Sequence, residues 1–359
     1  MAIRLSRPSA SLLARLTTYA AFVSAPGSPF PLGTGPYKTV AWNHQVGAVT
    51  LAPHARYWGG APRLRTITFR SEPDAEARAS LMIQGDAQIV MALPHRIAHK
   101  LERHRDISML RSAQFMSVYL SFNTAKPYLR DPAVRWALSM ALDRDQLVKE
   151  LYQGSATVAM GSVPPTLRRS RQAGSSVRFD PAEARRALAK TPVAARTLRL
   201  YLWRDARPYM PDPALAGRLL ASSFQAAGIR VTPVFVTFDE LNDRICGKAG
   251  LHDLVVFGYS PAYPDPENIY WLLSQEGMSC ARFADRDFQE LFNKASAEQD
   301  IAKRDSLFAQ LESLVALKRP WLPLAHVADH IAIRSEVKGY QYGFSFINLL
   351  WLKNAFLQR

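Results

Sequence analysis

The chain contains very little cysteine: Cys246 and Cys280 are the only two among its 359 residues. So few cysteines exclude a fold held together by a disulfide framework. They still permit one bridge in an oxidising compartment, and two free thiols are the alternative. The two residues lie on either side of a predicted strand and helix, so a bridge between them is geometrically conceivable.

Long apolar runs are also missing. Charge or proline interrupts each apolar stretch within about a dozen residues, which is too short to cross a bilayer. The N-terminus has features of a signal peptide, since Arg4 and Arg7 precede the apolar stretch SLLARLTTYAAFVSAPG, which contains a Val-Ser-Ala cleavage site. Arg15 interrupts that apolar region. The rival interpretation is an amphipathic helix with an apolar stripe made of Leu12, Leu13, Leu16, Tyr19 and Ala20.

Acidic residues are fewer than basic residues, 30 against 45, which gives a net charge of +15. Such an excess would suit nucleic acid or anionic lipid if it were concentrated on one face. The densest stretch, TLRRSRQAGSSVR, has no interleaved aromatic residues on which bases could stack. We therefore predict no nucleic-acid partner, and we interpret the segment 163–177 as a long, solvated surface loop.

Strands that alternate with helices predict an α/β fold, and the apolar fraction of 48% is enough for a substantial core. A turn at 33–36 precedes a predicted hairpin over 37–54. The strand LRTITFR, a helix closed by Gly85 and another short strand follow. That order favours a parallel pair of strands covered by the helix.

The clearest predicted helix runs from an Asp131 cap to Gly154, with Pro132 at its first position. The same aspartate-proline pair opens helices at Asp180 and Asp212. Two amphipathic helical stretches, 285–299 and 301–318, precede the apolar segment 321–334, which we interpret as a strand.

Catalytic signatures are absent from the sequence. GYSPA resembles the nucleophile elbow of hydrolases, but Ala262 replaces its final glycine and Pro261 follows Ser260. Two histidine pairs have i, i+4 spacing but lack the glutamate or third ligand of a zinc site; they are His95 with His99 and His326 with His330. We predict no enzyme, no metal and no cofactor.

The stretch FGYSPAYPDPENIYWLL carries the candidate site. The residues up to Tyr259 have the composition of a buried strand, Pro261 to Pro264 form a turn, and Asp265 followed by Pro266 is a helix cap. Ligands of open α/β sheets bind beyond the carboxyl ends of strands, which is where this turn lies. The pattern therefore favours a turn that faces a ligand.

Six segments occur in the order and at the spacing of a known family: GTGPYK with a following tryptophan, YWGGAPRL, Y-L-S-F-N, DPAVRWALSMALDRDQLV, GYSPAYPDPEN and LPLAHVADHIAIR. Together they resemble the extracytoplasmic solute-binding proteins of peptide-type ABC transporters, over essentially the whole chain. The resemblance implies an α/β, two-lobed periplasmic-binding-protein fold of the peptide-binder type, whose lobes close on a ligand.

The resemblance also implies the domain organisation. Residues 1–115 would be the remainder of lobe I, 116–325 lobe II and 326–359 a return to lobe I, with crossings near Met116 and Ala325. Members usually begin with a large part of lobe I ahead of the segment that corresponds to Ala2–Pro26. We therefore expect a truncated member, a misassigned start or one piece of a split protein, with part of a sheet edge exposed.

The implied function is that of the substrate-binding component of an ABC importer, which captures a peptide or peptide-like solute in the periplasm or another extracytoplasmic space. Its partners would be the permease subunits of the transporter. Two alternatives stay open. One is the ligand-sensing domain of a transcription regulator, and the other is a non-functional truncated remnant.

The candidate ligand-binding residues are those that the resemblance places at the turn and beside the crossings: Tyr259, Ser260, Ala262, Tyr263, Asp265, Tyr119, Asn123 and His326. The family pattern in the turn is Gly-Trp-x-x-Asp-Tyr-x-Asp-Pro, and its first aspartate receives the α-ammonium group in peptide-binding relatives. Ala262 stands at that position. Losing a charge-assisted hydrogen bond costs about 1.5 to 3 kcal/mol, or roughly ten- to a hundredfold in affinity. We expect that a free peptide amino terminus is not recognised in the usual way.

Overall fold

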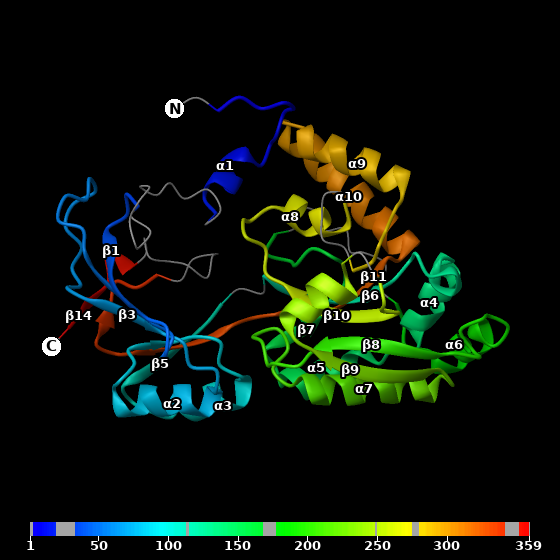
Figure 1. Cartoon of the computed structure of the whole chain (residues 1–359), viewed down its shortest axis with the longest axis horizontal. Helices are drawn as coiled ribbons and strands as arrows, with labels where there is room; N and C mark the ends of the chain where they lie inside the picture. Colours follow the sequence, from blue (N-terminus) through cyan, green and yellow to red (C-terminus); the bar gives the residue numbers. More distant parts are fainter. Residues whose placement is uncertain are drawn as a thin grey trace. The chain divides into compact units, whose positions relative to one another are not determined.

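The computed structural model describes residues 3–18, 33–112, 115–167, 177–247, 250–274, 280–341 and 352–358. The chain divides into two compact units (Figure 1). Unit 1 comprises Met1–Leu12 and Ala113–Ala328, and unit 2 comprises Leu13–Ser112 and Asp329–Arg359. The assignment of these units to the lobes of the family stays a prediction.

A six-stranded sheet forms the centre of unit 1, in the order β7-β11-β6-β10-β8-β9. Its strands are β6 Met116–Phe122, β7 Ala156–Val158, β8 Thr197–Trp203, β9 Arg230–Val236, β10 Leu254–Tyr259 and β11 Trp321–Val327. β8, β9 and β10 are parallel, whereas β6 is antiparallel to both β10 and β11. Strands β8, β9, β10 and β11 therefore end where β6 begins. We call this side of the sheet the carboxyl edge and the opposite side the amino edge.

Four helices of unit 1 begin at aspartate caps that the sequence predicts. The helices of the unit are η2 Pro127–Leu129, α4 Pro132–Met140, α5 Arg144–Tyr152, α6 Pro181–Leu188, α7 Pro213–Ala226, η3 Glu240–Ile245, α8 Pro266–Tyr270, η4 Trp271–Leu273, α9 Arg286–Ala297 and α10 Ile301–Lys318. The side chains of Asp131, Asp180, Asp212 and Asp265 each accept a backbone N–H bond in the first turn of the helix that follows. Proline at the first helical position lacks the N–H that would otherwise need a partner there. These predicted caps are confirmed.

The predicted single helix from Asp131 to Gly154 is wrong, because the structure has two helices there. α4 ends at Met140, and the carboxylate of Asp143 accepts the N–H of Gln146, 2.8 Å away, to start α5. Gln153, with φ of 49°, closes α5 in the left-handed conformation. An aspartate inside an apolar helical pattern thus starts a new helix, since its side chain replaces a missing backbone acceptor.

Unit 2 contains smaller sheets. β1 Tyr37–Asn43, β2 Ala48–Pro53 and β3 Ile67–Arg70 are antiparallel neighbours, and a second sheet has the order β4-β12-β5, with β4 Ile89–Val90, β5 Ile107–Arg111 and β12 His330–Arg334. α2 Ala75–Gln84 and α3 His95–Leu101 pack on that second sheet, and β13 Val337–Lys338 pairs with β14 Phe356–Leu357. The predicted hairpin is confirmed. The predicted parallel pair is wrong, because the strand before α2 pairs with β2 and the strand after it pairs with β12.

The predicted strand over 321–334 is also wrong, since the segment forms two strands in different units. β11 ends at Val327 and β12 begins at His330, so His326 and His330 do not share one face. His95 and His99 do share α3, with ring centroids 6.3 Å apart. Within the described ranges, no group of three or more histidine, cysteine or acidic side chains is arranged to hold a metal ion.

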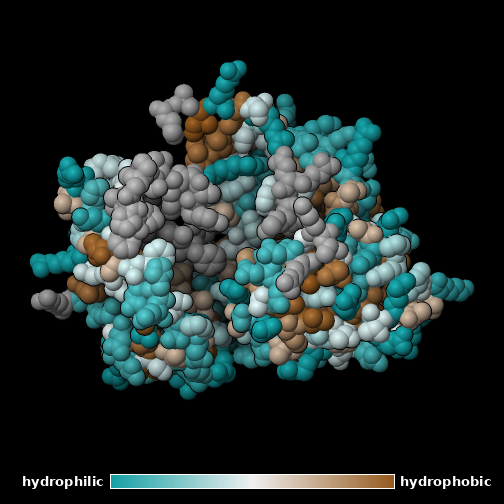
Figure 2. Space-filling model, in the orientation of Figure 1, coloured by the Kyte–Doolittle hydropathy of each residue, from teal (hydrophilic) through white to brown (hydrophobic). Residues whose placement is uncertain are grey.

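The ends of the chain and the predicted surface loop are described only in part. α1 Leu12–Leu16 leaves Leu13 79% exposed, and the apolar patch at the top of Figure 2 lies over this helix. Tyr19, Ala20 and the Val-Ser-Ala site lie outside the described residues, as do 168–176 of the predicted loop. The described ends of that loop are buried at Val163, Leu167 and Val177. Among the helices that the structure describes, none is long and apolar enough to cross a membrane.

Cys246 and Cys280 form a disulfide between residues 34 positions apart. Both residues pack against an apolar cluster on one face of the sheet, whose members include Tyr201, Val255 and Leu241. The bridge therefore fastens the segment after η3 to the segment before α9. Of the two alternatives that the sequence left open, one bridge or two free thiols, the structure has the bridge.

We predict that the bridge contributes substantially to the stability of unit 1. Removing the cross-link in a Cys246→Ser, Cys280→Ser variant should lower the free energy of unfolding by roughly 3 to 4 kcal/mol, because the unfolded chain gains loop entropy. Urea unfolding of both proteins measures this. A thiol titration of denatured, unreduced wild-type protein should find no free thiol, and finding two would contradict the pairing.

Asp329 lies where the chain enters unit 2 for the second time. Its backbone N–H donates to Oγ of Ser112 at 2.7 Å, and its carbonyl oxygen accepts the N–H of Ser112 at 2.9 Å. Asp329 is 3% exposed, and its carboxyl Oδ2 has no hydrogen-bond partner among the described residues. Burial raises the pKa of Asp329 to about 6, although the N–H groups of His330 and Ala92 and the charge of Arg78 act in the opposite direction.

We therefore expect Asp329→Asn to stabilise the protein near pH 7 but not near pH 4. The unfolded carboxyl titrates at about pH 3.9, so the stability present below that pH is lost as the pH rises through about 6. The gain near pH 7 should reach up to about 3 kcal/mol. Urea unfolding at the two pH values tests this, and an equal change at both would show that the charge of Asp329 is not the cause.

Candidate functional site

The turn after β10 is held by Asp265, whose negative charge is paired with a cation of the same protein. Asp265 caps α8 by accepting the N–H of Glu267 at 2.9 Å. Its two oxygens also accept from the guanidinium of Arg304 on α10, at 2.8 and 2.9 Å. The side chains of Asp265 and Arg304 are only 14% and 12% exposed. Arg304 also bonds Glu267 at 3.1 Å. The charge of Asp265 is therefore used within the protein.

Asn268 of α8 fixes the backbone and one wall of the turn. Its Oδ1 accepts the backbone N–H of Ala262 at 2.7 Å and the hydroxyl of Tyr259 at 3.2 Å. Tyr263 is 6% exposed, whereas Ser260 and Ala262 are partly accessible. The turn thus presents small side chains and backbone from a rigid frame.

One row of residues crosses the sheet at the carboxyl edge. Tyr259 of β10 lies opposite Ser117 of β6, which lies opposite His326 of β11. The imidazole Nδ1 of His326 is 2.9 Å from Oγ of Ser117, and both residues are buried. The structure therefore brings His326 and Tyr259 into the same row, with β6 between their strands.

The other two candidates lie away from the turn. Tyr119 has no exposed surface, its ring stacks on Trp321 at 4.5 Å, and its hydroxyl donates to the carbonyl of Ser162 at 2.6 Å. Burial raises the pKa of Tyr119 well above its usual value. Asn123 follows β6 at the amino edge, where its Nδ2 donates to the carbonyls of Gly250 and His252. Asn123 is therefore not brought together with the turn.

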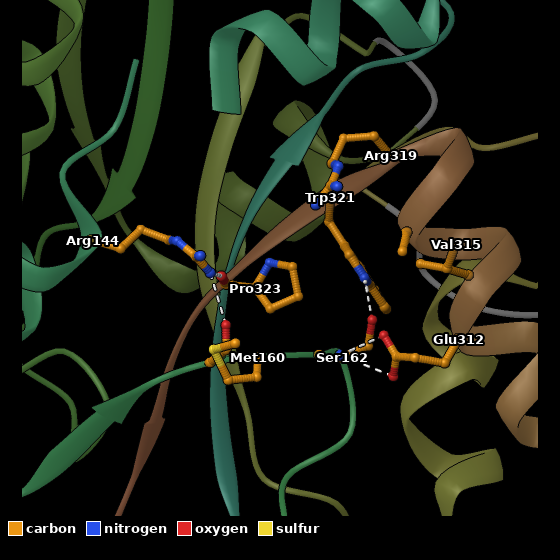
Figure 3. Close-up of a pocket in the computed structure, with 11 residues that line it drawn as sticks. Arg144, Met160, Ser162, Glu312, Val315, Arg319, Trp321 and Pro323 are labelled. Atoms are coloured by element: carbon orange, nitrogen blue, oxygen red, sulfur yellow. Dashed lines mark hydrogen bonds between the residues drawn. The ribbon is translucent and has the colours of Figure 1, made fainter. Parts of the chain in front are cut away.

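A small cavity lies beside the sheet, between β11 and α10 (Figure 3). Glu312 of α10 and Trp321 of β11 converge on Ser162 there, and Arg144 and Arg319 complete the charged part of the lining. The volume of about 10 Å³ has room for roughly one water molecule, so a peptide does not fit. A larger hollow lies along α9 and α10, and none of the candidate residues lines it. The carboxyl edge, where the predicted turn lies, stays the candidate in unit 1 for a peptide.

The sequence did not reveal a group of side chains beyond the end of β8, which consists of one cation and three aromatic rings. The guanidinium of Arg207 lies 5.0 Å from the ring centroid of Trp203, and Trp203 contacts Tyr209 and Phe238 edge-on. Tyr209 packs directly over Gly258 of β10, where an added Cβ would meet its ring at 2.0 Å. This contact places the group beside Tyr259. None of the ion pairs within the described ranges includes Arg207.

The sequence signal for this group was the dipeptide Arg207-Pro208 soon after an apolar strand. The strand DLVVFGY and the turn after it contain no arginine, so the residues next to the turn in sequence do not reveal a cation for a ligand. The cation that the fold brings to the turn comes instead from the loop after β8, a neighbour of β10 in the sheet.

We predict that Arg304→Met destabilises unit 1 by about 3 kcal/mol, since it leaves two carboxylates buried without their counter-charge. The matched control is Arg286→Ala. Arg286 pairs with Glu290 at 2.7 Å on α9, but both side chains are exposed, and such pairs contribute about 0 to 1 kcal/mol. Thermal or urea unfolding compares the two variants. Equal losses would show that the Arg304 pair does not hold the turn.

Known proteins are similar to this chain over most of its length. The model of the bacterial extracellular solute-binding proteins, family 5 Middle, matches residues 1–279. Probable di/tripeptide-binding protein 5 of Pseudomonas aeruginosa is 28% identical over 87% of the chain, and the dipeptide-binding protein of Escherichia coli is 27% identical over 94%. The chain spans 59% and 66% of the lengths of these two relatives.

The fold is similar to that of solved binding proteins. The dipeptide-binding protein of a Pseudoalteromonas species, in complex with Met-Leu, aligns with a TM-score of 0.86 and 23% identity, covering 99% of this chain and 73% of that one. The predicted α/β, two-lobed periplasmic-binding-protein fold is confirmed by this likeness. Because the family model matches more than half of its residues, the chain belongs to the bacterial extracellular solute-binding proteins, family 5.

Proposed function

We propose that this chain is the substrate-binding component of an ABC-type importer, and that it captures a peptide or peptide-like solute without catalysis. It would act in the periplasm or another extracytoplasmic space and deliver its solute to permease subunits. The observation that carries the proposal is the family match over residues 1–279, together with relatives that are named for dipeptide and tripeptide binding.

The proposed binding surface in unit 1 is the carboxyl edge. Tyr259, Ser260, Ala262 and Tyr263 would line the ligand from the turn, and His326 would contribute from the same row as Tyr259. The aromatic faces offer apolar contact, and the hydroxyl and backbone groups offer hydrogen bonds that suit a peptide backbone. Asp265 would support the turn through Arg304 rather than bind the ligand.

The charges at this edge favour one end of a peptide over the other. Arg207 carries a guanidinium that stacks on Trp203, and its Nε is buried without a hydrogen-bond partner among the described residues. We assign this cation to a ligand carboxylate. Ala262 offers no charge for an ammonium group. The preferred ligand would be a peptide with a free carboxyl terminus and a blocked or buried amino terminus.

The first test is the melting temperature of the protein with di- and tripeptides, N-acetylated peptides, C-amidated peptides, glutathione, haem and nickel. A ligand that binds only the folded state must raise the melting temperature. We expect shifts with N-acetylated peptides that equal or exceed those with unmodified ones, and a loss of the shift on C-amidation. No shift with any peptide would contradict the proposal of a peptide binder.

Point variants then locate the binding groups. Arg207→Gln should weaken the binding of peptides with a free carboxylate by roughly ten- to a hundredfold, and Ala262→Asp should strengthen the binding of unmodified peptides. Arg204→Gln is the matched control, because Arg204 is an exposed arginine of the same loop. Calorimetric titration measures the three affinities. Tight binding of free dipeptides that disappears on N-acetylation would refute the assignment at Ala262.

A further inference from the structure

The amino edge of the six-stranded sheet carries a group of exposed arginines. β8 and β9 begin there side by side, with Thr197 opposite Arg230 and Arg199 opposite Thr232. Arg199 and Arg230 therefore project from the same face, and Arg196 immediately precedes β8. Arg185 of α6 reaches the same edge, because its guanidinium donates to the carbonyl of Ala226, shortly before β9. All four side chains belong to exposed residues.

These arginines are oriented by neutral groups rather than by acids. The guanidinium groups of Arg185, Arg199 and Arg230 donate to the carbonyl oxygens of Ala226, Leu251 and Ala195 at 2.6, 3.1 and 3.2 Å. Arg196 lies 4.3 Å over the ring centroid of Tyr128. A guanidinium has five N–H donors, so each keeps several for a further acceptor.

Hydrogen bonds connect one acid, Asp253, to these arginines, and both of its oxygens already accept hydrogen bonds. Asp253 is 5% exposed, its Oδ2 accepts the backbone N–H of Arg199 at 2.8 Å, and its Oδ1 accepts the hydroxyl of Tyr128 at 2.5 Å. Across the described part of the chain, none of the ion pairs includes any of the four arginines. The group therefore presents several positive charges that the described protein does not neutralise.

We propose that Arg185, Arg196, Arg199 and Arg230 form a docking surface for the phosphate groups of an anionic lipid membrane. The planar guanidinium matches phosphate oxygens two at a time, and several cations on one surface add their attraction to an anionic bilayer. Leu251, which is 46% exposed beside Arg199, adds apolar contact. The opposite, carboxyl edge stays accessible to a ligand when this edge lies on a membrane.

Single-stranded nucleic acid fits this surface less well. Its bases would need exposed aromatic faces, but Arg196 covers the ring of Tyr128 and Asp253 holds its hydroxyl. The cavities between β11 and α10 and along α9 and α10 are lined by other residues. An exposed array of cations at the edge of a sheet suits a lipid surface.

The test is sedimentation of the protein with vesicles of phosphatidylcholine alone and of phosphatidylcholine mixed with phosphatidylglycerol. We expect binding only to the mixed vesicles, and less of it as salt is added. Each arginine removed should lower the partition coefficient roughly fivefold, so Arg196→Gln, Arg199→Gln, Arg230→Gln combined should lower it roughly a hundredfold. Peptide-induced melting shifts of this variant should equal those of the wild type, which separates this proposal from the proposed function.

The matched control removes the same charge from α3 and the residues after it in unit 2, by Arg96→Gln, Lys100→Gln, Arg103→Gln. These residues are also exposed, and this variant should keep vesicle binding within about threefold of the wild type. Equal losses in the two variants would show that only net charge matters and would overturn the proposal. So would an absence of binding to the mixed vesicles, or retention by immobilised polyglutamate without vesicle binding, which would indicate an acidic protein partner.

Discussion

The buried carboxylate of Glu312 is the group on which the arrangement of unit 1 depends. It accepts the backbone N–H of Ser162 at 2.9 and 3.1 Å and the hydroxyl of Tyr270 at 2.7 Å. Ser162 in turn receives bonds from Trp321 and Tyr119. One charge therefore joins α10, α8, the loop after β7 and the strands β6 and β11. A buried carboxylate is costly unless its oxygens are bonded, so these elements must assemble together.

The positive charge of the protein is divided between its interior and its surface. Arg135 and Arg144 are buried, and their guanidinium groups donate to backbone carbonyls, among them those of Lys318 and Arg319 at the end of α10 and of Pro323 in β11. Burial lowers the pKa of Arg135 to about 10. The carbonyls at a helix end carry partial negative charge, which suits a cation. Part of the net charge of +15 is thus structural.

Sequence reasoning succeeded where the controlling interaction is local. The caps at Asp180, Asp212 and Asp265 were predictable because each aspartate bonds a backbone N–H at most three residues away. The split at Asp143 rests on the same interaction and was missed only because the apolar pattern continues through it. β4, by contrast, pairs with β12 from the far end of the chain, a contact that the local order of strands and helices does not contain.

The same distinction between local and long-range contacts applies to the candidate site. Asp265 as a cap could be read from its neighbours, whereas its ion pair joins it to Arg304, 39 residues away. The row of Tyr259, Ser117 and His326 required the strand order, and so did the position of Tyr209 over Gly258. The resemblance to the family indicated the turn, because six short segments together carry information on long-range order that periodicity lacks.

The charge of the carboxyl edge follows from these long-range contacts rather than from the residues of the turn. A motif that ends in Asp-Pro suggests an acidic site, but both oxygens of Asp265 face Arg304, and Glu267 shares the same guanidinium. Ala262 adds no charge. In the proposed site, a ligand ammonium group would therefore meet no available carboxylate in the turn. Arg207, which comes from the loop after β8, would then decide which charge the site favours in a ligand.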